Sequence, residues 1–219
     1  ETRGMSRTVV HLLRHGEVDN PHRILYGRLP GYGLSPLGHQ MAETVAAAFR
    51  ASGADVTHLV SSPLQRAQET AAPIAEALGL TVSLDGRVIE ADNTLEGRAI
   101  AGGGARAMLS PSVLRHLYDP FTPSWGEPFA AQRDRMMAAI LDARRAAEGH
   151  EAIVVSHQSP IWAVRRWLQG KPLWHDPRQR ECSLASVTSL TFDGSTLVGH
   201  DYSEPAAALL ADASTVPGA

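Results

Sequence analysis

Two histidines and two arginines stand at the points of the chain where strands are expected to end. One apolar, β-branched run ends in Arg14 and is followed by His15, and a second such run is followed by His157. Arg66 falls in the first turn of a helix that is expected after another strand, 58–62. Because the carboxyl ends of parallel strands meet at one edge of a sheet, these four side chains should lie together there.

Such a cluster has the groups that transfer of a phosphoryl group requires without a metal. The non-bridging oxygens of the phosphoryl group need positive charge and fixed donors, which Arg14, Arg66 and His157 can supply. His15 can attack phosphorus through a ring nitrogen when its imidazole is neutral, and neighbouring arginines favour the neutral form. The residues therefore predict a metal-independent phosphoryl-transfer site with His15 as the nucleophile.

A carboxylic acid is also needed at such a site, because the leaving oxygen must receive a proton. Glu90 follows the third expected strand, 82–84, and is the first candidate. Asp92 and Glu96 lie in the same loop and are the alternatives. A structural interpretation, in which Glu90 is a strand-end carboxylate paired with an arginine, stands beside the catalytic one.

Strands and helices alternate along the part of the chain that carries these residues. Expected strands cover 8–14, 58–62, 82–84 and 152–156, and expected helices begin at Ser35-Pro36, Ser62-Pro63, Phe129 and Pro160. A hairpin across Asp193-Gly194 is expected near the end of the chain. This alternation predicts an α/β fold with a mostly parallel sheet that helices flank on both faces.

Two segments lack a clear periodicity. The stretch 98–128 contains Gly102-Gly103-Gly104 and several prolines, so we interpret it as a small irregular insertion or lid. The glycine triplet lacks the Lys-Ser/Thr of a phosphate-binding P-loop and is expected to be a linker. The alanine-rich stretch 206–219 is expected to be a flexible tail. We interpret residues 1–219 as a single domain.

The composition argues against several classes of protein. A net charge of −3 without a basic run gives no sign of nucleic-acid binding, and no apolar stretch is long enough to span a membrane. Cys182 is the only cysteine, which excludes a disulfide within the chain and a CxxC metal pair. Lys171 is the only lysine, so phosphate recognition falls to arginines. The sequence suggests no metal, no cofactor and no signal peptide, and we expect a cytoplasmic protein.

Four motifs resemble those of the histidine phosphatase superfamily, which has the phosphoglycerate mutase-like fold. They occur in the family's order and extend over most of the chain: Leu13-Arg14-His15-Gly16-Glu17, Leu34-Ser35-Pro36-Leu37-Gly38, the run 61–71 and Val155-Ser156-His157. The resemblance implies a phosphohistidine intermediate on His15, with Glu90 as the acid and base. It also implies a phosphate pocket formed by Arg14, Arg66 and His157.

Asn20, Arg28 and Gln158 are the candidate substrate-binding residues. Asn20 resembles the asparagine that lines the family's phosphate pocket, after a shortening of the loop by one residue. Arg28 lies in the loop 26–31, which resembles a little-characterised branch of the superfamily, and it is either a substrate-binding arginine or a solvated loop residue. Gln158 stands where the family usually has glycine, and the loop after Glu90 is one residue shorter than usual.

These features predict a phosphomonoesterase that acts on a small phosphorylated metabolite. A phosphoglycerate-type mutase is the first alternative. The resemblance to the superfamily implies, however, that its mutases have longer chains and an insertion larger than the segment 98–128. A phospho-ligand binding module without turnover is the second alternative. The expected partner is a small phosphorylated substrate rather than a nucleic acid or a membrane, and the edge strands leave room for a homodimer.

Overall fold

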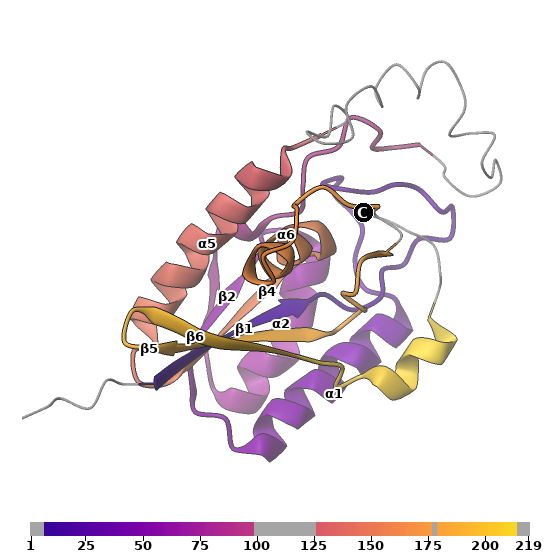
Figure 1. Cartoon of the computed structure of the whole chain (residues 1–219). Helices are drawn as coiled ribbons and strands as arrows, with labels where there is room; N and C mark the ends of the chain where they lie inside the picture. The colour runs from indigo at the N-terminus through magenta and orange to yellow at the C-terminus, as the bar shows by residue number, and fades with distance from the viewer. Residues whose placement is uncertain (1–6, 99–125, 177–178, 214–219) are drawn as a thin grey trace, which may run out of the picture.

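The computed structural model of the protein describes residues 7–98, 126–176 and 179–213 (Figure 1). Its strands are β1 (Arg7–Arg14), β2 (Val56–Ser61), β3 (Val82–Leu84), β4 (Glu151–Ser156), β5 (Val187–Asp193) and β6 (Thr196–Ser203). Its helices are α1 (Pro36–Ser52), α2 (Gln65–Leu78), α5 (Phe129–Ala146) and α6 (Gln158–Leu168), with 3-10 helices η1 (Gly86–Val88) and η3 (Ala207–Asp212).

The strands form one sheet in the order β3-β2-β4-β1-β5-β6. The first four of these are parallel to one another, whereas β5 and β6 are antiparallel to their neighbours. The register of the two central strands places Arg14 opposite Ser156, so the residues that follow β1 and β4 leave the sheet side by side. The prediction of an α/β fold with a mostly parallel sheet is confirmed.

Helices cover both faces of this sheet (Figure 1). On one face, α5 and α6 pack on the sheet, and Ile140 of α5 belongs to the same buried cluster as Val154 of β4. On the other face, α1 and α2 pack on the sheet, and Ile74 of α2 belongs to the same buried cluster as Val155. Consecutive residues of β4 are therefore buried on opposite faces, as expected for a central parallel strand.

Helix α1 begins and ends as the sequence predicts. The Ser35 hydroxyl accepts a hydrogen bond from the amide of Gly38 at 3.0 Å, and Pro36 occupies the first helical position. Gly53, in the left-handed conformation with φ 68°, ends the helix. The first turn of α1 packs closely under the loop after β1, because a Cβ on Gly16 would lie 2.5 Å from the carbonyl oxygen of Gly38.

The two helices that lead away from the site begin at other positions than expected. α2 has Leu64 as its N-cap residue, without a side-chain capping bond, because the hydroxyl of Ser62 lies 2.7 Å from His157 instead. α6 begins directly after His157, two residues before the expected start at Pro160. Proline is tolerated in the first turn of a helix, where its missing amide hydrogen costs nothing.

The two aperiodic segments are described in part. Residues 99–125, most of the expected insertion, lie outside the described residues, and the lid remains a prediction. Within the expected flexible tail, residues 207–212 form η3, where Leu209 and Leu210 pack against the cluster under α1 and α2. The part of the expected tail up to residue 213 thus includes a 3-10 helix whose leucines cover an apolar surface. Residues 214–219 lie outside the described part.

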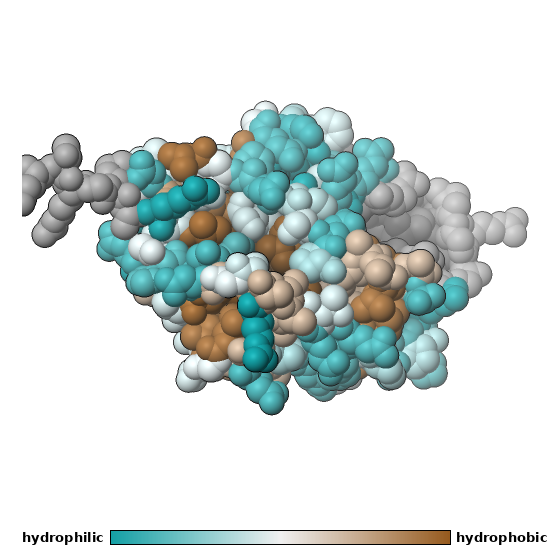
Figure 2. All heavy atoms as spheres, turned by 90° about the horizontal axis from the view of Figure 1, so that it is seen from below, coloured by the Kyte–Doolittle hydropathy of each residue, from teal (hydrophilic) through white to brown (hydrophobic). Residues whose placement is uncertain are grey.

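The surface shows scattered apolar residues. On the face seen in Figure 2, apolar residues form small separate patches between hydrophilic ones. Four large apolar side chains are exposed among the described residues, and they come from different parts of the chain: Leu84, Trp167, Trp174 and Val198. Single exposed apolar residues of this kind need no special explanation. No helix in the described part of the chain combines the length and the apolar character that crossing a membrane requires.

Candidate active site

The side chains that follow β1 and β4 meet at the carboxyl edge of the sheet. His15 and His157 are fully buried, and their ring centroids lie 5.1 Å apart. Arg66, the second residue of α2, is also fully buried, and its charge acts on both imidazoles. Arg14 acts on both imidazoles as well. The four side chains thus lie together at this edge of the sheet.

The backbone around Gly16 fixes the tautomer of His15. Nδ1 of His15 lies 2.7 Å from the carbonyl oxygen of Gly16, and a carbonyl can only accept a hydrogen bond. Nδ1 therefore carries the proton, and Nε2 carries the lone pair. The amide of Gly16 donates to the hydroxyl of Thr70 on α2 at 3.1 Å, which holds the loop in place. Nε2 is buried and has no hydrogen-bond partner in the described part of the chain.

The surroundings of His15 favour its neutral form. Burial lowers the pKa of His15 well below its usual value of 6.5, and the charges of Arg66 and Arg14 lower this pKa further. The hydrogen bond to Gly16 acts in the opposite direction but is the smallest of these causes. A neutral imidazole with an unpaired, buried Nε2 is the state that a histidine nucleophile requires.

In His157 the paired and unpaired ring nitrogens are exchanged relative to those of His15. Its Nε2 lies 2.7 Å from the hydroxyl of Ser62, which also accepts a longer hydrogen bond from the amide of Leu64 at 3.4 Å. When the Ser62 hydroxyl donates to Nε2 of His157, the proton of the neutral imidazole stands on Nδ1. Nδ1 is buried and has no acceptor among the described residues. Burial, followed by the charge of Arg66, lowers the pKa of His157 well below 6.5.

Both arginines have guanidinium N–H groups that form no hydrogen bond within the described part of the chain. Nη2 of Arg66 donates to the carbonyl oxygen of Gly27 at 2.6 Å, and its guanidinium lies 4.7 Å from the ring centroid of Tyr26. Nε and Nη1 of Arg66 are buried without an acceptor in the described chain. Nη1 of Arg14 donates to the carbonyl oxygen of Cys182 at 2.5 Å, whereas its buried Nε has no such acceptor. Buried unpaired donors on two cations indicate a site for an anion.

Of the three candidate acids, Glu90 is the most deeply placed. Its side chain is 1% exposed; Oε1 accepts from the amide of Ala91 at 2.7 Å, and Oε2 is buried without a partner in the described part. Asp92 is exposed, and Oε1 of Glu96 is engaged by the backbone amide of Arg28 at 2.7 Å. The geometry therefore favours Glu90, although Glu96 also lies within electrostatic range of Arg66.

Two of the predicted substrate-binding residues are used within the protein. The side chain of Asn20 donates to the carbonyl of Ile24 at 2.8 Å and accepts from its amide at 2.9 Å, and so closes the loop after β1. Nε of Arg28 donates to the carbonyl oxygen of Glu90 at 2.7 Å, and Nη2 donates to Glu127 at 3.1 Å. Arg28 therefore supports the backbone of the candidate acid. This role differs from both roles that the sequence suggests, a substrate-binding arginine and a solvated loop residue.

Gln158 lies next to the site, at the first position of α6. Its side-chain amide donates to the carbonyl oxygen of Cys182 at 3.3 Å, the same oxygen that accepts from Arg14. The segment before β5 is tied to the nucleophile loop as well, because the amide of Ala185 donates to the carbonyl of His15 at 3.2 Å. These bonds join the nucleophile loop, the start of α6 and the segment before β5 into one structure.

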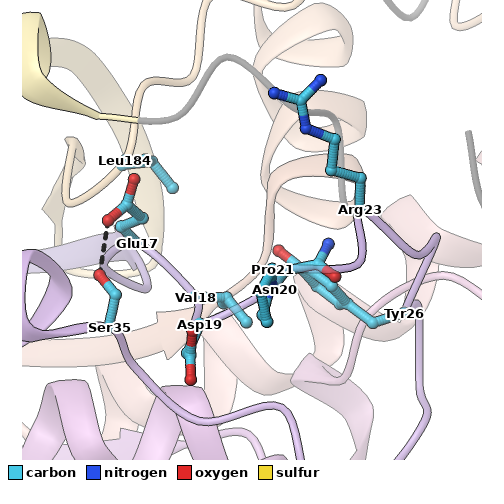
Figure 3. Close-up of a pocket in the computed structure, with 9 residues that line it drawn as sticks. All are labelled: Glu17, Val18, Asp19, Asn20, Pro21, Arg23, Tyr26, Ser35 and Leu184. Carbon is cyan, nitrogen blue, oxygen red and sulfur yellow. Dashed lines mark hydrogen bonds between the residues drawn. The ribbon is translucent and has the colours of Figure 1, made fainter. Parts of the chain in front are cut away.

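A cavity of about 360 Å³ adjoins the buried cluster (Figure 3). Its walls come from the loop after β1, the N-cap of α1 and the segment before β5: Glu17, Val18, Asp19, Asn20, Pro21, Arg23, Tyr26, Ser35 and Leu184. The cavity does not include the histidines, but it shares Tyr26 with the packing around Arg66. The cavity therefore offers space for a ligand beside the buried cluster that holds the unpaired polar atoms.

Several residues of the site had no clear signal in the sequence. Ser62 was interpreted as a helix cap, and its contact with His157 depends on the spacing between β2 and β4. Tyr26 was interpreted as part of a loop, and Thr70 as part of a helix. The acceptors of the two arginines are backbone carbonyls of Gly27 and Cys182, which any residue type would supply. No group of three or more metal-binding side chains occurs among the described residues.

Comparisons with known proteins agree with this arrangement. The family model of the histidine phosphatase superfamily, branch 1, matches residues 10–204. "Uncharacterized protein Rv0525" of Mycobacterium tuberculosis is 53% identical over 200 residues, 91% of this chain and 98% of that protein. "Probable phosphoglycerate mutase GpmB" of Enterobacter sp. (strain 638) is 31% identical over 191 residues, 81% of this chain and 83% of that protein.

A solved structure has the same fold. The mycobacterial glucosyl-3-phosphoglycerate phosphatase Rv2419c in complex with VO3 superposes with a TM-score of 0.65 at 26% identity, covering 84% of this chain and 92% of that one. The family match extends from β1 to the end of β6 and so includes both histidines and both arginines of the buried cluster. The chain therefore belongs to branch 1 of the histidine phosphatase superfamily.

Proposed function

We propose that the protein is a metal-independent phosphomonoesterase that works through a phosphohistidine on His15. The observation that carries this proposal is the buried, unpaired Nε2 of a neutral His15 beside the unpaired donors of two arginines. A histidine with only a structural role would be expected to have both ring nitrogens paired. One relative is named as a phosphatase and another as a probable mutase, and both names denote chemistry on phosphate esters, which supports the same reaction class.

In the first step, Nε2 of His15 gives its lone pair to phosphorus, and the bond between phosphorus and the ester oxygen breaks. Arg14, Arg66 and Nδ1–H of His157 bind the non-bridging oxygens and stabilise the charge of the transition state. The electron pair of the broken bond stays on the leaving oxygen, which takes a proton from Oε2 of Glu90. An alcohol leaves, and His15 carries the phosphoryl group.

In the second step, water replaces the alcohol. The Glu90 carboxylate takes a proton from the water molecule as its oxygen attacks phosphorus, and the bond to Nε2 of His15 breaks. The electron pair returns to Nε2, and inorganic phosphate leaves. Glu90 is then protonated and His15 neutral, so the site is ready for another cycle. Throughout, Nδ1–H of His15 stays bonded to the Gly16 carbonyl, which prevents rotation of the ring.

Release of phosphate from p-nitrophenyl phosphate tests the proposal. Wild type should release phosphate, and His15→Ala should not. His39→Ala is the matched control, because His39 is exposed on α1, away from the buried cluster. Its activity should equal that of wild type. Wild-type activity in His15→Ala would disprove the role of His15, and a chelator such as EDTA should leave the rate of wild type unchanged.

A mutase is the second candidate, because a relative at 31% identity carries that name. A mutase returns the phosphoryl group of His15 to a second hydroxyl of the substrate instead of to water. Incubation with 3-phosphoglycerate separates the two activities. A phosphatase produces inorganic phosphate, whereas a mutase produces 2-phosphoglycerate without net loss of organic phosphate.

A further inference from the structure

Arg180 is a third arginine at this site, and the reaction described above does not use it. It lies two residues before Cys182, whose carbonyl oxygen accepts hydrogen bonds from Arg14 and Gln158. Burial lowers the pKa of the Arg180 guanidinium, the charge of Glu90 raises this pKa, and the charge of Arg14 lowers it again. Arg180 is thus within electrostatic range of both the candidate acid and the phosphate-binding arginine.

A short chain of hydrogen bonds holds Arg180 in place. Nδ1 of His175 donates to the carbonyl oxygen of Leu173 at 2.7 Å, so Nε2 of His175 is free to accept. Nε of Arg180 donates to this Nε2 at 2.9 Å. The His175 ring packs against Phe129 and Trp162, with ring centroids 4.8 and 6.1 Å away. Burial is the largest cause that lowers the pKa of His175, to about 4, so the ring stays a neutral acceptor near neutral pH.

The orientation of Arg180 leaves its other donors unused. Its Nε is bonded to His175, and no residue in the described part of the chain accepts a hydrogen bond or forms an ion pair with Nη1 or Nη2. The guanidinium is partly buried and pre-oriented, which lowers the entropy cost of binding a ligand. A fixed planar fork of this kind matches the geometry of a carboxylate or a phosphate.

The three arginines at the site form no ion pair with a carboxylate among the described residues, since Arg14 and Arg66 bond to backbone carbonyls and Arg180 bonds to His175. Arg14, Arg66 and Arg180 carry three positive charges, and the two buried histidines are neutral. A phosphoryl dianion supplies two negative charges, and Glu90 supplies none while it holds the proton for the leaving group. The neighbouring arginines have a carboxylate partner of their own, since the guanidinium groups of Arg28 and Arg135 both bond to Glu127.

Arg23 is the other arginine near the substrate space, and it fits this role less well. It is exposed, and its backbone has a φ of 50°, which places it on a turn of the loop after β1. Figure 3 shows it at the rim of the cavity, whose wall also carries Glu17 and Asp19. The negative charges of these carboxylates disfavour an anion at that wall.

We infer that Arg180 binds a second anionic group, a carboxylate or a second phosphate, of a phosphomonoester whose first phosphoryl group lies against His15. The inference rests on the proposed function for the position of that phosphoryl group. It restricts the substrate class to phosphate esters that carry a further negative charge. Phosphate esters of neutral alcohols, such as simple alkyl or aryl phosphates, have no second anionic group that the Arg180 guanidinium could bind.

Binding to the inactive His15→Ala variant tests this without turnover. Isothermal titration calorimetry compares 3-phosphoglycerate with glycerol 3-phosphate, which differ only in a carboxylate against a hydroxymethyl group. A second pair, fructose 1,6-bisphosphate and fructose 6-phosphate, differs in a second phosphate. The His15→Ala variant should prefer the more anionic member of at least one pair, and adding Arg180→Gln should reduce this preference about tenfold, the scale of a lost charge pair.

The control variant is Arg145→Gln in the same His15→Ala background. Arg145 is exposed near the end of α5, which leads toward the amino end of β4, opposite the site. Loss of this charge should leave the preference unchanged. Equal or undetectable binding of both members in both pairs would overturn the inference, as would a preference that survives Arg180→Gln. A preference that depends on Arg180, in a protein whose wild type never releases phosphate, would refute the phosphatase and still support the anion site.

Discussion

His15 and His157 face each other with their ring centroids 5.1 Å apart, and each keeps one buried ring nitrogen without a partner in the described part of the chain. The carbonyl of Gly16 fixes the ring of His15, and the hydroxyl of Ser62 fixes the ring of His157. Nε2 of His15 carries a lone pair, and Nδ1 of His157 carries a proton when Ser62 donates to the other nitrogen of that ring. One can attack phosphorus while the other donates to a phosphoryl oxygen.

Removal of the Ser62 hydroxyl should weaken catalysis through His157. In Ser62→Ala, Nε2 of His157 loses its donor, so the proton of the ring is no longer held on Nδ1. We expect kcat/KM to fall about tenfold and the affinity for inorganic phosphate to fall in parallel, the scale of one lost buried hydrogen bond. Steady-state kinetics and calorimetry measure both. Ser83→Ala, on the exposed strand β3, should change neither, and an unchanged Ser62→Ala would show that His157 needs no such support.

Glu90 should matter most when the leaving group is a poor one. In Glu90→Gln, the oxygen of an alkyl alcohol has no proton donor, so hydrolysis of glycerol 3-phosphate should slow by about 100-fold or more. p-Nitrophenolate leaves without a proton, and hydrolysis of p-nitrophenyl phosphate should slow much less. The ratio of the two rates is the measurement.

Glu96→Gln is the comparison for this prediction, because Glu96 lies in the same loop and the amide of Arg28 donates to its Oε1. The glutamine side chain can keep that hydrogen bond, so the ratio of the two rates should stay close to that of wild type. A ratio that changes in Glu96→Gln and not in Glu90→Gln would transfer the acid role to Glu96.

Gly16 should not tolerate a side chain. A Cβ there would lie 2.5 Å from the carbonyl oxygen of Gly38, so Gly16→Ala must separate the nucleophile loop from the first turn of α1. We expect a loss of about 1–3 kcal/mol of stability, as for other overpacked sites, together with loss of activity. Urea unfolding measures the first. Gly86→Ala is the control, because a Cβ there would meet nothing within 4 Å. Equal stability of the two variants would contradict the close packing.

Stability should decrease as the solution becomes acidic. The pKa values of His15 and His157 are lowered in the folded protein, whereas in the unfolded chain they lie near 6.5. Below that pH the unfolded chain binds protons that the folded protein rejects, so the free energy of unfolding falls with pH. Their contribution is complete above 6.5 and is lost progressively below it.

The variant His15→Asn separates this contribution from that of other groups. It removes one of the two fully buried histidines, so its free energy of unfolding should depend less on pH below 6.5 than that of wild type. Urea titrations at several pH values compare the two slopes. His39→Asn should keep the wild-type slope, because His39 is exposed. Identical slopes in His15→Asn and wild type would show that His15 is not held neutral.

The sequence predicted the centre of the site because strand ends determine it. Arg14 and His15 follow β1, and His157 follows β4, so the parallel pairing of these strands is sufficient to bring them together. Arg66 could be placed for a related reason, since it opens the helix after β2. Apolar runs and helix-start signals are local features of the sequence, and they can be recognised without knowledge of the rest of the fold.

The partners of these side chains could not be predicted, because they depend on how loops fold back over the sheet edge. Arg14 is held by the carbonyl of Cys182 and Arg66 by that of Gly27, and backbone carbonyls have no sequence signature. The side chain of Arg28 donates to the backbone carbonyl of Glu90 and to Glu127, and the loop sequence does not indicate either contact. Arg180 gave no signal, because only the path of the segment before β5 brings it near the site.

The central claim is that His15 carries the phosphoryl group. Rapid mixing of wild type with a ³²P-labelled phosphomonoester that it hydrolyses, followed by alkaline quenching, should trap label on the protein as an acid-labile, base-stable adduct. Peptide mapping should assign this adduct to His15, and His15→Ala should not be labelled. Steady release of phosphate by wild type with no label on His15 at any time would contradict the account and would indicate direct attack by water.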